Sequence, residues 1–147
     1  MIDVSEKAEI LREATASGTI HLKPETIQYV KEGKTAKGDP LYTAKIAAIL
    51  AAKKTSDLIP LCHPLPLSSV KVCSKICDDT TIEVSVTVKT CAQTGVEMEA
   101  LTAVTVALLT IWDMTKQYEK DANGQYPSTV IQNIHVVRKC KQQVDML

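Results

Sequence analysis

The hydrophobic pattern of this chain changes its period once, at Thr94-Gly95. Before that point apolar side chains occupy every second position, namely Ile82, Val84, Val86 and Val88. This alternation predicts a strand that buries one face. The segment that follows, VEMEALTAVTVALLTIWDMTKQYEK, is predicted to form a helix of about 20 residues, apolar almost all round through Ala100–Ile111. Such a helix must be buried, so the chain has to supply a sheet and further helices that cover it.

The rest of the chain supplies those elements. Asp39 is a natural N-cap, and Pro40 suits the first turn of the alanine-rich helix that it begins. The remaining patterns predict a strand at Thr15–Leu22, helices at Pro24–Glu32 and from Pro40 to about Lys54, a hairpin of Ser69–Cys77 and Thr80–Cys91, and a last strand at Thr129–Lys139. This order predicts one α+β domain over residues 1–147, with a ferredoxin-like antiparallel sheet packed by helices on one face.

The composition argues against a nucleic-acid or membrane partner. Lys+Arg and Asp+Glu both number 17 and aromatic residues are only 3%, so no nucleic-acid partner is expected. The opening MIDVSEKAEILREA is charged from residue 3, and no apolar run approaches the roughly 20 residues of a membrane span. We therefore expect a cytoplasmic protein with no membrane partner.

The five cysteines lie at positions 62, 73, 77, 91 and 140. Their odd number, without a signal peptide or a C-x-x-C pair, predicts reduced thiols and no metal site. A metal pair of Cys62 and His63 is the alternative, and it would need ligands from elsewhere.

Cys62 and His63 belong to the segment LIPLCHPLPLSS, which has prolines at 60, 64 and 66. Each proline fixes its own φ and biases the preceding residue toward extended geometry, so the segment is stiff and neither helix nor central strand. It is either a buried apolar connector or a rigid segment that presents His63 to a ligand.

Both ends of the long helix are charged. Glu97 and Glu99 either complement the helix dipole or contribute to a polar pocket. Asp113 and Lys116 form either a surface ion pair or an acid–base pair. A continuous helix would place Glu97 and Asp113 about 24 Å apart, too far for one small substrate. Either the helix is broken, or two chains build the site and the protein is an obligate oligomer.

Five segments resemble, in order, the motifs of the cyclic pyranopterin monophosphate synthases, the protein C family of molybdenum cofactor biosynthesis. They are MIDVSEKAE, KGDP-x-x-TAKIA, LIPLCHPL, TGVEMEAL and WDMTK, and the resemblance covers about residues 1–139. It implies conversion of 3′,8-cyclo-7,8-dihydro-GTP into cyclic pyranopterin monophosphate with release of pyrophosphate. The reaction needs proton transfers and neutralisation of triphosphate charge. No cofactor is required, although Mg²⁺ on the triphosphate is compatible with the chemistry.

The resemblance also implies residue roles. Asp113 matches the catalytic acid–base, and Lys116 and Lys37 match catalytic lysines. A partly desolvated lysine can have its pKa lowered enough to transfer protons, and a charged lysine can neutralise phosphate. Glu97 and Glu99 suit the amide and amino edge of a guanine-like base, and Arg12 suits phosphate. The full set of expected substrate-binding residues is Arg12, Leu61, Cys62, His63, Glu97, Met98, Glu99 and Lys139. The resemblance further implies a hexamer built as a trimer of dimers, with active sites between subunits.

Two departures from the family pattern stand out. The usual glycine-rich tail after the last strand is replaced by RKCKQQVDML, and Thr115 replaces a common cysteine. A non-catalytic module that binds a small ligand between subunits is the alternative function, but it does not explain why the charged set is intact.

Overall fold

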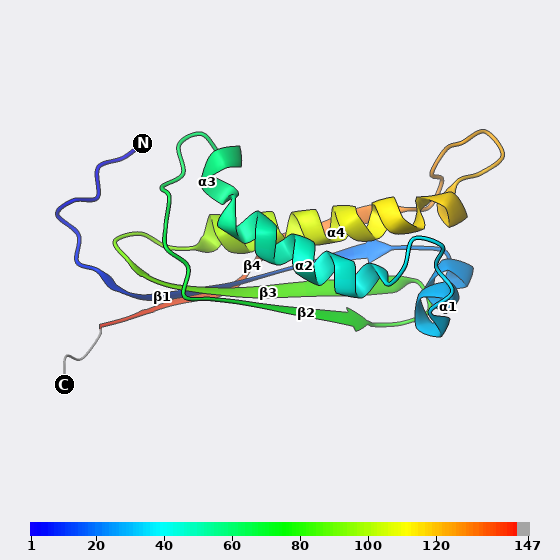
Figure 1. The fold of residues 1–147 in the computed structure, drawn as a ribbon, viewed down its shortest axis with the longest axis horizontal. Helices are drawn as coiled ribbons and strands as arrows, with labels where there is room; N and C mark the ends of the chain where they lie inside the picture. The colour runs from blue at the N-terminus through cyan, green and yellow to red at the C-terminus, as the bar shows by residue number, and fades with distance from the viewer. Residues whose placement is uncertain (144–147) are drawn as a thin grey trace.

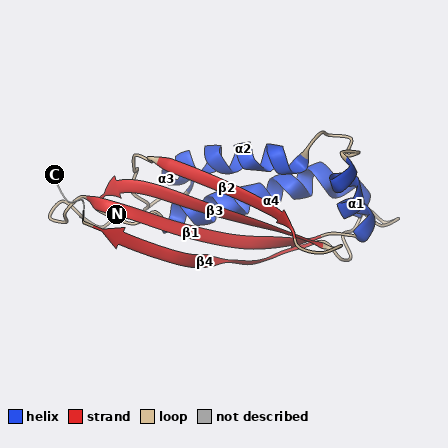
Figure 2. Ribbon diagram, turned by 90° about the horizontal axis from the view of Figure 1, so that it is seen from below, coloured by secondary structure: helices blue, strands red, loops and turns tan. Residues whose placement is uncertain are grey.

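A computed structural model describes residues 1–143 of the chain. Its elements are, in order, β1 (Ile10–His21), α1 (Pro24–Glu32), α2 (Pro40–Lys53), α3 (Thr55–Leu58), β2 (Ser69–Ile76), β3 (Thr81–Ala92), α4 (Glu97–Glu119) and β4 (Val130–Gln142) (Figure 1). All four strands join one antiparallel sheet with the order β2-β3-β1-β4. The helices pack on one face of it, and the opposite face carries no helix of residues 1–143 (Figure 2). The predicted α+β class and ferredoxin-like arrangement are confirmed.

The core lies between the sheet and α4, as the change of period predicts. The four alternating side chains of β3 are fully buried, and they face the buried residues of α4, which include Val104, Leu108 and Ile111. The alanines of α2 allow it to lie closely along α4 (Figure 1). The carboxylate of Asp39 caps α2 by accepting hydrogen bonds from the backbone N–H groups of Leu41 and Tyr42.

Several boundaries differ from the predictions. β1 begins at Ile10 rather than Thr15 and β4 continues to Gln142 rather than ending at Lys139, because these polar ends pair with each other. The short helix α3 was not predicted. α4 is buried along one side only: Leu109 is 53% exposed, so the expectation of burial all round was wrong for the single chain.

By length and composition alone, α4 is also long and apolar enough to cross a membrane. The expectation that no apolar run approaches the length of a membrane span was therefore wrong for this helix. Half of its most apolar stretch is buried inside the fold, and a buried core helix can have the same length and composition.

Gly18 in β1 lies close to side chains of α4 and β4. A Cβ at this position would lie 2.9 Å from both Leu108 Cδ1 and Ile134 Cγ1. We expect Gly18→Ala to lower the free energy of unfolding by about 1–3 kcal/mol, because the packed core must shift to accommodate the methyl group. Urea unfolding followed by circular dichroism measures this, with Thr19→Ala as the neighbouring control. An unchanged midpoint for Gly18→Ala would show that the core adapts freely.

Candidate active site

The expected site residues lie near the two ends of α4. The helix runs without a break from Glu97 to Glu119, so Glu97 and Asp113 are about 24 Å apart along its axis. The alternative of a broken helix is therefore wrong. The expected residues form two separate groups in one chain, at the Glu97 end and at the Asp113 end of α4.

At the Asp113 end, the three expected catalytic side chains meet. Lys116 Nζ donates to Asp113 Oδ1 at 2.7 Å, and Lys37 Nζ donates to Asp113 Oδ2 at 3.0 Å. Lys37 reaches α4 because its loop is held there: the backbone N–H of Ala36 donates to the hydroxyl of Tyr118. All three charged side chains are at least 41% exposed. Exposed ion pairs contribute little stability, so this convergence needs another explanation.

The two lysines determine the charge state of this group. Hydrogen bonds from Lys116 and Lys37 lower the pKa of Asp113 to about 2. In return, the hydrogen bond to Asp113 raises the pKa of Lys116 above 10.5. The free chain therefore does not lower the pKa of Lys116. At neutral pH Asp113 is therefore a carboxylate and Lys116 an ammonium group.

At the Glu97 end, the proline-rich segment lines a cavity of about 410 Å³, which we call the rail pocket. Its walls include five expected substrate-binding residues, namely Leu61, Cys62, His63, Glu97 and Met98. The segment is not a buried connector, since Leu61 is 72% exposed. The arrangement agrees with a rigid segment that presents His63, and the volume suits a small ligand.

Glu99 lies behind this pocket and is only 3% exposed. Its Oε1 accepts a hydrogen bond from Cys62 Sγ at 3.9 Å, while its Oε2 is buried without a partner among the described residues. Burial raises the pKa of Glu99 above 4.5, and burial together with this carboxylate raises the pKa of Cys62. A buried acceptor without a donor is costly for the fold, which marks Glu99 as a candidate ligand contact.

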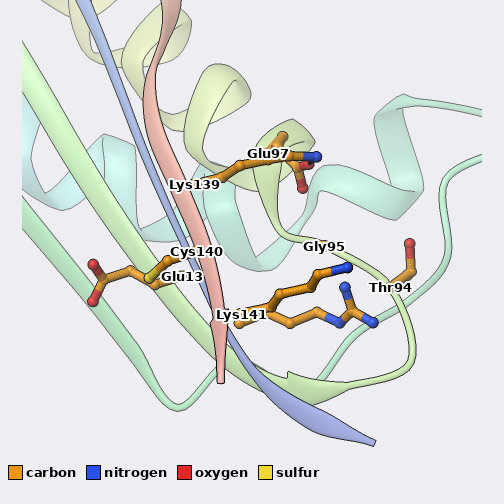
Figure 3. A pocket seen from close by; sticks show the side chains of 8 residues that line it. Glu13, Thr94, Gly95, Glu97, Lys139, Cys140 and Lys141 are labelled. Carbon is orange, nitrogen blue, oxygen red and sulfur yellow. Dashed lines mark hydrogen bonds and ion pairs between the residues drawn. The ribbon is translucent and has the colours of Figure 1, made fainter. Parts of the chain in front are cut away.

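A second cavity of about 330 Å³, which we call the cationic pocket, adjoins the first. Arg12, Lys139 and Lys141 contribute to it together with Glu97. Lys139 and Lys141 point to the same side of β4 as Thr94 and Gly95, whereas Glu13 and Cys140 point away (Figure 3). Lys139 Nζ donates to Glu97 Oε1 at 2.7 Å. Although partial burial acts in the opposite direction, this contact lowers the pKa of Glu97.

Arg12 contributes positive charge to the cationic pocket and also stabilises the local backbone. Its Nε and Nη2 donate to the carbonyls of Ala92 and Gln93, both at 3.0 Å, and so hold the turn before Glu97. Gly95 in that turn leaves room for the Glu97 carboxylate, since a Cβ there would lie 2.0 Å from Glu97 Oε2 and would force that side chain to move. The guanidinium retains further N–H donors for a ligand.

Lys141 was missed by the sequence analysis. It pairs directly with Arg12 across β1 and β4, which places it on the same face of the sheet. The signal was present, because Lys139 and Lys141 are two residues apart and therefore share a strand face. Lys141 was overlooked because the predicted last strand ended at Lys139.

No group of three or more His, Cys, Asp or Glu side chains that could hold a metal ion occurs within residues 1–143. All five cysteines are free, and Cys62 is the one that is partly buried.

Comparison with known proteins identifies the family to which the motifs at both ends of α4 belong. The model of the MoaC family matches residues 1–141. The chain belongs to the MoaC family. Its match extends through β4 as far as Lys141 and covers both groups of site residues.

Curated relatives in the MoaC family match nearly the whole chain. A protein of Thermococcus onnurineus is 55% identical over 97% of this chain and 91% of its own length. Proteins of Methanococcoides burtonii and Sulfurisphaera tokodaii are 54% and 55% identical, over 98% and 99% of this chain and 90% and 96% of their own lengths. Each carries the name probable cyclic pyranopterin monophosphate synthase.

The unpartnered carboxylate of Glu99 predicts an unusual pH dependence. Because its pKa in the folded state is raised, the folded chain binds more protons than the unfolded chain between pH 4.5 and that raised value. The stability it contributes is therefore lost as pH rises through the raised pKa. We expect Glu99→Gln to unfold at a higher urea concentration than wild type at pH 7, with a difference that shrinks toward pH 4.5.

Glu119 provides the matched control on the same helix. It is fully buried, but its oxygens accept hydrogen bonds from the backbone of Lys23 and the hydroxyls of Thr26 and Thr129. Glu119→Gln should lose about 1–3 kcal/mol of stability at pH 7, because one of its oxygens is replaced by an amide NH₂ that cannot accept these hydrogen bonds. If Glu99→Gln were destabilised in the same way, the unpartnered oxygen would have a partner in solution.

Proposed function

We propose that this chain is a cyclic pyranopterin monophosphate synthase. It converts 3′,8-cyclo-7,8-dihydro-GTP into cyclic pyranopterin monophosphate and pyrophosphate, an early step of molybdenum cofactor biosynthesis. The names and full-length similarity of the relatives support this activity. The observation that carries the mechanism is the contact of Asp113 with Lys37 and Lys116 on an open surface.

In the proposed mechanism, the Asp113 group moves protons. A carboxylate with a pKa of about 2 is a weak base, and a lysine paired with it is a weak acid. A substrate that takes over the hydrogen bonds of Lys116 or Lys37 removes the cause of both shifts. The pKa of Asp113 then rises toward its ordinary value and that of Lys116 falls toward its own, so Asp113 becomes a stronger base and Lys116 a stronger acid than in the free chain.

The Glu97 end is proposed to bind the nucleotide. Glu99 supplies an acceptor for the amide and amino N–H groups of the guanine-derived ring, and a ligand lacking those donors would leave it unpaired. The cationic pocket binds the triphosphate. Arg12 and Lys141 are like charges placed directly opposite each other, an arrangement that an anion between them would stabilise.

We also propose that the active site is shared between two chains of a homo-oligomer, a hexamer built as a trimer of dimers. The separation of about 24 Å between the two groups supports a shared site. The Asp113 end is open to water in the described part of the chain, and a second chain would supply a wall that excludes it. Exposed apolar side chains on one side of α2, namely Tyr42, Ile46 and Leu50, offer a surface for self-association.

The remaining features of the proposal concern partners and conditions. The enzyme works in the cytoplasm on a small molecule, without nucleic acid or membrane. It needs no cofactor of its own. Any Mg²⁺ would arrive bound to the triphosphate of the substrate.

The proposal is tested by supplying the purified protein with the cyclised nucleotide and following pyrophosphate release and pterin fluorescence. We expect wild-type turnover, and a loss of about 10²- to 10⁴-fold in Asp113→Asn and in Lys116→Ala, since each removes a proton-transfer group. Lys54 and Asp57 form an exposed ion pair with the same spacing elsewhere, so Lys54→Ala and Asp57→Asn are matched controls. Binding of the nucleotide without pyrophosphate release by wild type would instead favour a non-catalytic binding protein.

A further inference from the structure

His63 contacts the beginning of the chain as well as the rail pocket. Its Nε2 lies 2.7 Å from the backbone carbonyl oxygen of Ile2. A carbonyl oxygen can only accept a hydrogen bond, so Nε2 must carry the hydrogen. Within residues 1–143, Nδ1 of His63 forms no hydrogen bond.

The other two histidines have the opposite arrangement. His21 Nδ1 faces the carbonyl of Ser128 at 3.0 Å, and His135 Nδ1 faces the carbonyl of Asn133 at 2.6 Å. By the same argument, Nδ1 carries the hydrogen in both rings. His63 therefore differs from every other histidine of the chain, and the difference follows from its contact with the N-terminal segment.

That segment has a defined local structure. The carboxylate of Asp3 accepts hydrogen bonds from the backbone N–H and the hydroxyl of Ser5, at 2.9 and 2.5 Å. The backbone N–H of Lys7 donates to the carbonyl of Val4 at 3.0 Å and closes the next turn. On the other side of the contact, Pro64 restricts the backbone of His63. A folded turn thus meets a stiff segment, which fixes the ring between them.

We propose that the N-terminal segment Ile2–Ser5 is a positioning element that fixes His63 in the Nε2–H form, so that Nδ1 is the nitrogen that meets the substrate. The orientation of a histidine and its tautomer are set by the hydrogen bond of the other nitrogen. A neutral His63 then offers Nδ1 as an acceptor, which suits an N–H or O–H donor of the bound nucleotide. Because Nδ1 is close to the main chain, that donor must approach the proline-rich segment itself. Only the identity of the bound molecule rests on the proposed function.

The tautomers can be measured directly by ¹⁵N NMR of histidine-labelled protein at a pH where the rings are neutral. We expect one histidine with a protonated Nε2 and two with a protonated Nδ1, and the first signal should vanish in His63→Asn. In a chain lacking residues 1–3, with Val4 replaced by the initiating Met, His63 should become a mixture of both forms. His21 and His135 should not change. A protonated Nδ1 on His63 in the full chain, or an unchanged His63 after truncation, would overturn the proposal.

Activity provides a second readout with a matched control. The truncation should lower kcat/KM by about 10- to 100-fold, as when the orienting partner of a metal-bound histidine is lost. Ile2→Ala keeps the carbonyl and should remain within about twofold of wild type. If the truncated chain does not fold, the full-length double variant Asp3→Ala with Ser5→Ala removes the turn instead. Absence of turnover in wild type would refute the proposed function, while the NMR measurement would still decide the tautomer.

Discussion

The continuity of α4 is the constraint on which the rest of this structure depends. One side of the helix fills the core against β1 and β3, which fixes its position in the fold. Both ends carry charged side chains, namely Glu97 and Glu99 at the first and Asp113 and Lys116 at the last. The helix that stabilises the fold therefore also separates Glu97 from Asp113 by about 24 Å. A site that uses both ends can form only where two chains meet.

Two buried glutamates on this helix show how stability and function are balanced. Glu119 accepts hydrogen bonds from both neighbouring elements, and it ties the start of α1 and the start of β4 to the end of α4. Glu99 leaves one oxygen without a donor among residues 1–143. Both carboxylates are buried, but burial of Glu119 stabilises the fold because its oxygens accept hydrogen bonds, whereas burial of Glu99 is costly because one of its oxygens does not. An unsatisfied carboxylate beside a cavity is understandable if a ligand supplies the missing donor.

The sequence predicted the fold well wherever local physical signals were strong. The alternating strand β3, the Asp39 cap and the change of period at Gly95 all appear where expected, because each depends on a few adjacent residues. The paired ends of β1 and β4 were missed, since that pairing depends on residues about 130 positions apart. Lys141 was lost for the same reason. The contact between Ile2 and His63 also has no sequence signal, because it uses a backbone carbonyl that every residue possesses.

The most direct test of the shared site is subunit complementation. Glu99→Gln and Asp113→Asn should each be inactive alone, because each damages one group of site residues. If the two variants are unfolded together at equal concentration and reassembled, half of the dimers contain one chain of each kind, and each such dimer has one intact site. The account predicts recovery of about a quarter of wild-type activity. A mixture no more active than its separate components would contradict it, because both groups would then have to act within one chain.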